Sequence, residues 1–128
     1  MIKTIFTEQA PEAIGPYSQA KQVGGMLYCS GQIPLCPKTG VLLGDDVASQ
    51  AKQALENLKA VLEAGGSSMN HVLKTTCYLL SMDDFAAFNA VYAEYFGESM
   101  PARACVAVSE LPKGALCELD AIAVVEEG

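Results

Sequence analysis

The chain has 128 residues, of which 51% are hydrophobic and 18% charged, and its formal net charge at pH 7 is −7. A chain of this length forms one domain, spanning residues 1–128, and buries enough surface to fold without a disulfide or a metal ion. The acidic balance disfavours nucleic acid as a partner, because such binding relies on lysine and arginine to neutralise phosphates. The share of charged residues is low for the surface of a small monomer, which favours burial of part of that surface against other subunits. The alternative explanation for the high hydrophobic share is a core rich in alanine and valine.

The cysteines and the single histidine limit the kinds of catalytic or metal site that the chain can form. The five cysteines are odd in number and form no CxxC motif, which is typical of reduced, apolar cysteines in a cytoplasmic protein. His71 is the only histidine, so the sequence supports neither a metal site nor a Ser-His-Asp triad. The N-terminal residues lack the apolar core of a signal peptide, and no window approaches the length of a membrane span. We therefore expect no membrane partner.

The first half of the chain predicts two strands and a helix. Residues 2–6 and 26–33 are short apolar runs typical of strands, separated by the turn-rich "APEAIGPYS". The loop at 34–44 predicts a small hairpin. Apolar residues at helical spacing then indicate a helix over 45–66, with aspartates at its start and Gly65-Gly66 at its end.

The second half predicts a strand, a helix and two more strands. Residues 71–80 are β-branched and aromatic, and Ser81 with Asp84 resembles a capping box that opens the next helix. That helix carries an aromatic stripe (Phe85, Phe88, Tyr92 and Phe96), which Asn89 shares at a spacing of four residues. A polar residue there needs a hydrogen-bonding partner. The last two strands, 102–109 and 116–125, are joined by a turn around "LPKG".

This order of elements indicates an α+β fold, a sheet with two helices packed on one face. The other face then needs cover, which again favours an assembly of several subunits.

Two charged residues lie inside the last two strands, which are otherwise apolar. Arg103 and Glu118 are either partners in a structural ion pair, solvent-facing residues, or parts of a ligand pocket. Period-two alternation places Arg103 on one face with Cys105, and Glu118 on one face with Asp120. Periodicity alone does not pair Arg103 with Glu118.

An ordered set of short motifs resembles the Rid family (reactive intermediate deaminases, also called the YjgF family). The motifs are "IGPYSQA", "SGQIP", "VYAEYF", "PARACV" and "ELDAIAV", and they run along essentially the whole chain. The resemblance implies a chorismate-mutase-like fold with a mixed sheet, assembled as a homotrimer with three clefts between subunits. It also implies hydrolysis of 2-imino acids, such as 2-iminobutanoate and 2-iminopropanoate, to 2-oxo acids and ammonia without a cofactor. PLP-dependent dehydratases would supply these imines without needing physical contact.

The resemblance also implies a set of site residues. Arg103 would bind the substrate carboxylate with its planar fork of donors, and Glu118 would orient water and exchange protons. The other residues that the family pattern places in the pocket are Tyr17, Ser30, Asn89 and Cys105. The backbone N–H of Gly31 can join the hydroxyl groups of Tyr17 and Ser30, because a glycine allows close approach. With no histidine nearby to activate its thiol, Cys105 is expected to form part of the pocket wall.

The sequence is also compatible with two other functions. One is a non-catalytic module that binds or senses 2-oxo acids. The other is an endoribonuclease or translation inhibitor, which the acidic composition disfavours.

Overall fold

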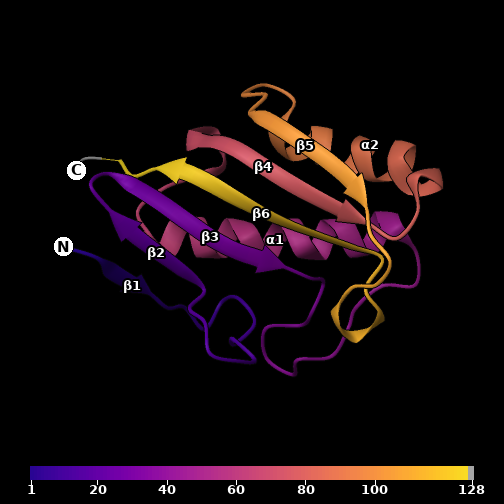
Figure 1. Cartoon of the computed structure of the whole chain (residues 1–128), viewed down its shortest axis with the longest axis horizontal. Coiled ribbons are helices and arrows are strands. Elements are labelled where there is room, and N and C mark those ends of the chain that lie inside the picture. The colour runs from indigo at the N-terminus through magenta and orange to yellow at the C-terminus, as the bar shows by residue number, and fades with distance from the viewer. Residues whose placement is uncertain (127–128) are drawn as a thin grey trace.

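Six strands form one mixed sheet, and both helices lie against the same face of it (Figure 1). The computed structural model describes residues 1–126. The elements are β1 (Lys3–Ile5), β2 (Ala20–Val23), β3 (Met26–Gln32), α1 (Val47–Ala64), β4 (Val72–Leu79), α2 (Phe85–Phe96), β5 (Ala102–Ala107) and β6 (Cys117–Val124). The strand order is β1-β2-β3-β6-β4-β5, and β4 and β5 form the one parallel pair in it. The predicted α+β fold, with a mixed sheet and two helices on one face, is confirmed.

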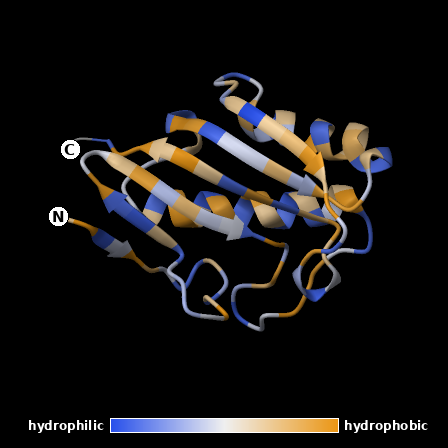
Figure 2. Ribbon diagram, viewed as in Figure 1, coloured by the Kyte–Doolittle hydropathy of each residue, from blue (hydrophilic) through white to orange (hydrophobic). Residues whose placement is uncertain are grey.

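Helix α1 forms where its caps and its apolar spacing predict it. The Asp46 side chain accepts a hydrogen bond from the Ser49 backbone N–H at 2.8 Å, and Gly66 adopts a left-handed φ of 83° just beyond the end of the helix. Figure 2 shows hydrophobic positions along α1 interleaved with hydrophilic ones. The hydrophobic positions, among them Leu55 and Leu58, are fully buried against the sheet.

Helix α2 begins later than the capping box predicts. The Ser81 hydroxyl accepts from the Asp83 N–H at 3.1 Å, and residues 82–84 form a 3-10 turn before α2 starts at Phe85. Ser81 thus caps the turn that leads into α2, but Asp84 makes no capping hydrogen bond with its side chain, so the capping box is only half formed. The aromatic stripe is confirmed, since Phe88, Tyr92 and Phe96 are buried in the core. The Tyr92 hydroxyl is hydrogen-bonded to the Thr75 hydroxyl of β4 at 2.7 Å, which ties α2 to the sheet.

The strands differ from the sequence prediction in two places. Strand β2 was not predicted; it forms a hairpin with β3 through Gly24 and Gly25, both at positive φ. The segment around "LPKG" does turn, as a 3-10 helix over Pro112–Gly114, but the strands that it joins are not neighbours. Strand β4 lies between β5 and β6.

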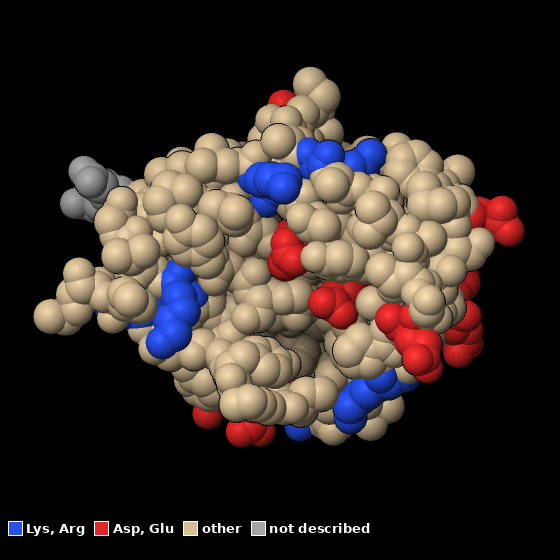
Figure 3. Space-filling view, in the orientation of Figure 1, with Lys and Arg blue, Asp and Glu red and all other residues tan. Residues whose placement is uncertain are grey.

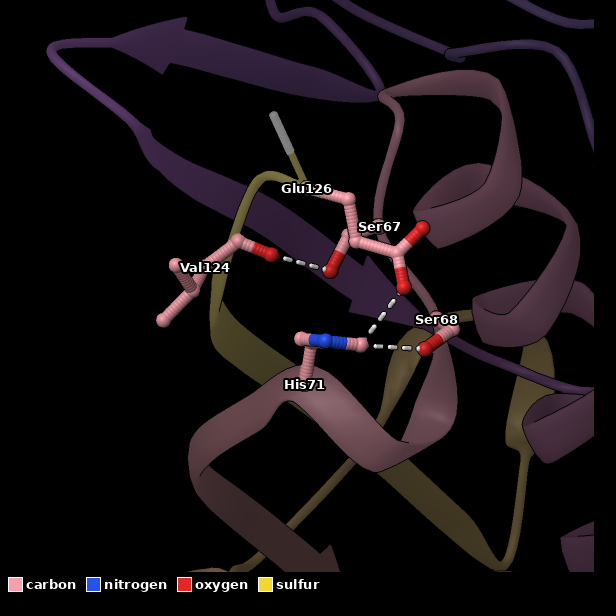
Figure 4. Close-up of polar contacts among 5 residues, drawn as sticks. All are labelled: Ser67, Ser68, His71, Val124 and Glu126. Atoms are coloured by element: carbon pink, nitrogen blue, oxygen red, sulfur yellow. Dashed lines mark hydrogen bonds and ion pairs between the residues drawn. The ribbon is translucent and has the colours of Figure 1, made fainter. Parts of the chain in front are cut away.

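The end of the described chain is fastened beside the start of β4 (Figure 4). The Ser67 hydroxyl donates to the Val124 carbonyl at 2.6 Å. Nδ1 of His71 lies 2.7 Å from the Ser68 hydroxyl and 3.3 Å from Oε1 of Glu126. These contacts hold the segment after β6 against the turn that follows α1.

The second face of the sheet has no helix over it. Figure 3 shows this open face, with acidic side chains at the upper rim of a hollow in its lower half. Tyr28 of β3 and Val106 of β5 are 46% and 45% exposed, although both belong to strands. Neither helix of residues 1–126 is long and apolar enough to cross a membrane.

Candidate functional site

Arg103 lies on the helix-covered face of the sheet, at the outer edge formed by β5. Its Cα is in register with that of Thr75 on β4, and its Nη1 donates a hydrogen bond to Oδ1 of Asn89 on α2 at 2.6 Å. The guanidinium carbon also lies 4.7 Å from the ring centroid of Tyr92 and 5.5 Å from that of Phe85. Asn89 and two aromatic rings therefore orient the Arg103 side chain.

The guanidinium of Arg103 retains donors for a ligand. The one ion pair among residues 1–126 joins His71 and Glu126, so within the described chain Arg103 has no carboxylate partner. Its side chain is exposed and lines a cavity of about 420 Å³ together with Asn89 and Met100. A planar fork with free donors is suited to a carboxylate, which it can bind bidentately.

Cys105 follows Arg103 on the same face of β5. It is partly buried, packs against the core and pairs in register with Cys77 of β4. Burial raises the pKa of the Cys105 thiol, and the nearby charge of Arg103 offsets only part of this effect. A nucleophilic cysteine needs a lowered pKa, so the environment of Cys105 favours a wall-forming role.

Glu118 lies on the other face, in a hollow of about 530 Å³ on the open side of the sheet. The hollow is lined by Ile14, Tyr17, Ser30, Gly31, Ile33, Pro112 and Glu118. Burial, followed by the negative charge of Asp120, raises the pKa of Glu118 above its ordinary value. A carboxyl group with a raised pKa beside apolar walls is suited to general acid–base chemistry.

A β-bulge places Gly31 under the Glu118 carboxylate. Cys29 pairs with Ala121 and Gln32 with Leu119, so two residues of β3, Ser30 and Gly31, oppose one residue of β6. A Cβ atom at Gly31 would overlap Oε2 of Glu118. The missing side chain of Gly31 is thus what lets the carboxylate lie over β3.

Tyr17 and Ser30 supply hydroxyl groups on the same side of the sheet as Glu118. The Tyr17 hydroxyl accepts from the Ile14 N–H at 3.4 Å, which leaves its own proton free for a ligand. The Ser30 hydroxyl donates to the Ser18 carbonyl at 2.6 Å, so in this geometry it is an acceptor toward a ligand. Of these two hydroxyl groups, only that of Tyr17 can therefore donate its proton to a ligand in this geometry.

The segment before β2 is held in place by Gln19. Its Oε1 accepts from the Thr7 N–H at 2.7 Å, and its Nε2 donates to the carbonyls of Thr7 and Pro11 at 3.0 and 2.9 Å. Gln19 is 4% exposed, so these bonds are shielded from water. They fix the loop that carries Tyr17 at the rim of the Glu118 hollow.

The predicted site residues thus form two separate groups in one chain. The first group (Arg103, Asn89 and Cys105) lies on the helix-covered face, and the second (Glu118, Gly31, Ser30 and Tyr17) lies on the open face or at its edge. The sheet itself separates them. Arg103 and Glu118 of the same chain therefore cannot form an ion pair or contact one small ligand together.

Several residues around these two groups were not predicted as site residues. Ile14, Ile33 and Pro112 give the Glu118 hollow its apolar wall, and Tyr92 with Phe85 brackets Arg103. The only sequence signal for Tyr92 and Phe85 was their membership of the α2 stripe next to Asn89. Within residues 1–126 no three His, Cys, Asp or Glu side chains gather closely enough to hold a metal ion.

The sequence profile of the family described as Endoribonuclease L-PSP matches residues 7–125. The chain belongs to this Rid (YjgF) family. A RutC family protein of Pyrococcus horikoshii is 57% identical over 98% of this chain and 100% of its own length. A Salmonella typhimurium protein named 2-iminobutanoate/2-iminopropanoate deaminase is 50% identical over 97% of this chain and 98% of its own.

Solved structures agree with this Rid membership. The YjgF gene product of Escherichia coli superimposes with a TM-score of 0.91 at 48% identity, covering 97% of this chain and 99% of its own. Names differ among Rid relatives, however: a Lactococcus lactis protein that is 46% identical, over 98% of this chain and 99% of its own, is named as a regulator. Family membership therefore does not by itself fix the activity.

Proposed function

We propose that this protein hydrolyses reactive 2-imino acids, such as 2-iminobutanoate and 2-iminopropanoate, to 2-oxo acids and ammonia. The observation that carries the proposal is a half-buried glutamate of raised pKa in one part of the fold, combined with an oriented arginine with free donors in another. Relatives at 50% identity that are named as deaminases of these substrates support it.

The two groups of residues come together only between protomers. In the proposed homotrimer, the open face of one chain packs against a neighbour, and the exposed edge strand β5 brings Arg103 of one protomer to the Glu118 hollow of another. The uncovered sheet face, with exposed Tyr28 and Val106, supports such packing. Three equivalent sites would result.

The proposed reaction needs no cofactor. Arg103 would bind the substrate carboxylate and place the C=N carbon over Glu118. Glu118 would take a proton from a water molecule as the water oxygen bonds to that carbon, and would return a proton to the nitrogen. Glu118 would then pass the hydroxyl proton of the resulting carbinolamine to its nitrogen as the C–N bond breaks, so that ammonia leaves and the C=O group of the 2-oxo acid remains. The Tyr17 hydroxyl would donate to the substrate carboxylate or to the water.

Imine hydrolysis is measured most directly in a coupled assay. A PLP-dependent threonine dehydratase generates 2-iminobutanoate, and formation of the 2-oxo acid is followed with and without this protein. Faster 2-oxo acid formation supports the deaminase. Tight binding of the 2-oxo acid without faster formation of it would instead support a non-catalytic module that senses 2-oxo acids. One relative is named as a regulator, which agrees with this second candidate.

Glu118→Gln should slow hydrolysis by about a hundredfold or more, because the amide keeps the shape of the side chain but exchanges no proton.

The stability of the Glu118→Gln variant at neutral pH should equal or exceed that of the unchanged protein. The raised pKa of folded Glu118 means that the folded state holds more protons than the unfolded chain between the ordinary and the raised pKa. Stability therefore falls as pH rises through that interval, and the variant lacks this loss. Rates and melting temperatures at pH 5 and 8 check this, and a variant that melts lower but keeps its rate would assign Glu118 a structural role.

Gly31→Ala tests the close approach of the carboxylate to β3. The added methyl group overlaps the end of a flexible side chain, so the chain should fold while Glu118 moves out of the hollow. We expect hydrolysis to fall to the level of Glu118→Gln with little change in melting temperature. A large fall in melting temperature would mean that the methyl group meets rigid backbone and that the explanation is wrong.

A further inference from the structure

A second carboxylate lies next to Glu118 on the open face and has no part in the reaction as described so far. Asp120 is two residues further along β6, so the two side chains point to the same face and their Cα atoms lie about 7 Å apart along the strand. Both side chains are half-buried. Like charges at this spacing in a partly desolvated place resist simultaneous ionisation.

Tyr78 fixes the position of Asp120. On β4, Tyr78 pairs in register with Glu118, yet its hydroxyl donates diagonally to Oδ2 of Asp120 at 3.2 Å. Burial, followed by the charge of Asp120, raises the pKa of Tyr78, so the phenol stays protonated and remains a donor. The Tyr78 hydroxyl thus fixes the Asp120 side chain beside Glu118.

Glu118 itself is left without a fixed partner. Among residues 1–126 no side chain makes a hydrogen bond or an ion pair with its carboxyl group, which lies over Gly31. After burial, the charge of Asp120 is what raises the pKa of Glu118. Of the two acids, Tyr78 donates a hydrogen bond only to Asp120.

The titratable groups that face Glu118 come from three elements. Asp120 belongs to β6 itself, Tyr78 to the neighbouring strand β4, and Tyr17 to the loop across the hollow; Ser30 and Gly31 on β3 do not titrate. In the proposed trimer, the Arg103 side chain of a neighbouring protomer joins them and acts with the opposite sign. Asp120 is thus the one carboxylate in this set.

We propose that Asp120 is a positioning residue that acts on the reaction through Glu118: the Tyr78 hydroxyl holds it beside Glu118 on the open face, where its negative charge acts on the Glu118 carboxyl group. The inference rests on the proposed role of Glu118 in proton exchange, and it explains how the Glu118 carboxyl group is suited to that role. A carboxylate that binds a proton more strongly is a stronger base toward the attacking water. The same proton is then returned to the departing nitrogen.

Asp120→Asn tests the inference, because it removes the charge while keeping an acceptor for Tyr78. The titration midpoint of the Glu118 carboxyl group is measured in the full-length protein without substrate, by NMR of ¹³C-labelled glutamate, with the signal assigned from its loss in Glu118→Gln. We expect the midpoint, and the corresponding limb of the pH profile of kcat/KM, to move to lower pH. Asp120→Glu, which keeps the charge, should move them less.

The matched control is Asp83→Asn, which removes the same charge from an exposed position before α2 and should leave both midpoints unchanged. If Asp120→Asn does not fold, Asp120→Thr removes the charge with a residue that favours strands and still offers Tyr78 an acceptor. A Glu118 midpoint that stays in place in the folded variants overturns the inference, even if the protein hydrolyses imines. A midpoint that moves in a protein without imine hydrolysis supports the coupling and refutes the proposed function.

Discussion

Arg103→Ala should abolish detectable imine hydrolysis while the chain stays folded. A hydrogen bond to a charged group contributes about 1.5–3 kcal/mol, so the loss of a bidentate pair should weaken binding of a 2-oxo acid by at least about tenfold to a hundredfold. The fold should survive because Arg103 is exposed and has no carboxylate partner among residues 1–126 whose charge its removal would leave unpaired. Activity, melting temperature and mass are measured on the same variant.

Arg103→Lys should recover little of the activity. An ammonium group is a point charge that cannot donate to Asn89 and bind a carboxylate bidentately in the same plane. Lys59→Ala removes a cation from the exposed side of α1 and serves as the control, with activity expected to be unchanged. A folded Arg103→Ala protein that hydrolyses imines at the original rate would defeat the assignment of Arg103.

Two inactive variants should restore activity when they assemble together. If each site takes Arg103 from one protomer and Glu118 from the next, mixed trimers of Arg103→Ala and Glu118→Gln chains contain some sites with both native residues. In every trimer that contains both variants, one of the three sites takes its Arg103 from a Glu118→Gln chain and its Glu118 from an Arg103→Ala chain, so about a third of the sites are intact. Co-expression with two different affinity tags and purification through both gives the mixed trimers.

The restored rate of the purified mixed trimers should therefore approach about a third of the original, against a background of each variant alone. Light scattering on the same samples should report about three times the chain mass of 13.5 kDa. A mass of one chain, or mixed trimers as inactive as their parents, would rule out a site shared between protomers.

The sequence predicted a helix correctly where its capping residues or the spacing of its apolar residues gave a clear signal. Asp46 and Gly66 mark the ends of α1 in both the sequence and the structure, and the aromatic stripe of α2 is buried as its spacing indicates. Strand β2 was missed because Ala20–Val23 is short and carries Lys21 and Gln22, so it has little apolar signal. It becomes a strand through its hairpin with β3.

The arrangement of the site could not be predicted from one chain's periodicity. Alternation shows that Arg103 and Glu118 each belong to one face of a strand, but not which face the helices cover. The turn between β5 and β6 suggests that these two strands are neighbours. In the structure β5 pairs in parallel with β4 instead, which places Arg103 two strands away from β6. Long-range pairing of this kind depends on the whole sheet. The one local signal was Asn89 in an aromatic stripe, which the structure explains as the acceptor for Arg103.

The buried amide of Gln19 has a consequence for the thermodynamics of ligand binding. By bonding to both the N–H and the C=O of Thr7, it does for an irregular segment what a neighbouring strand does for a regular one. The segment that carries Tyr17 is therefore already ordered before any ligand arrives. Its conformational entropy is lost once, when the chain folds, and not again at each turnover. For a substrate of only a few atoms, which makes few contacts, such preorganisation preserves most of the binding free energy that those contacts provide.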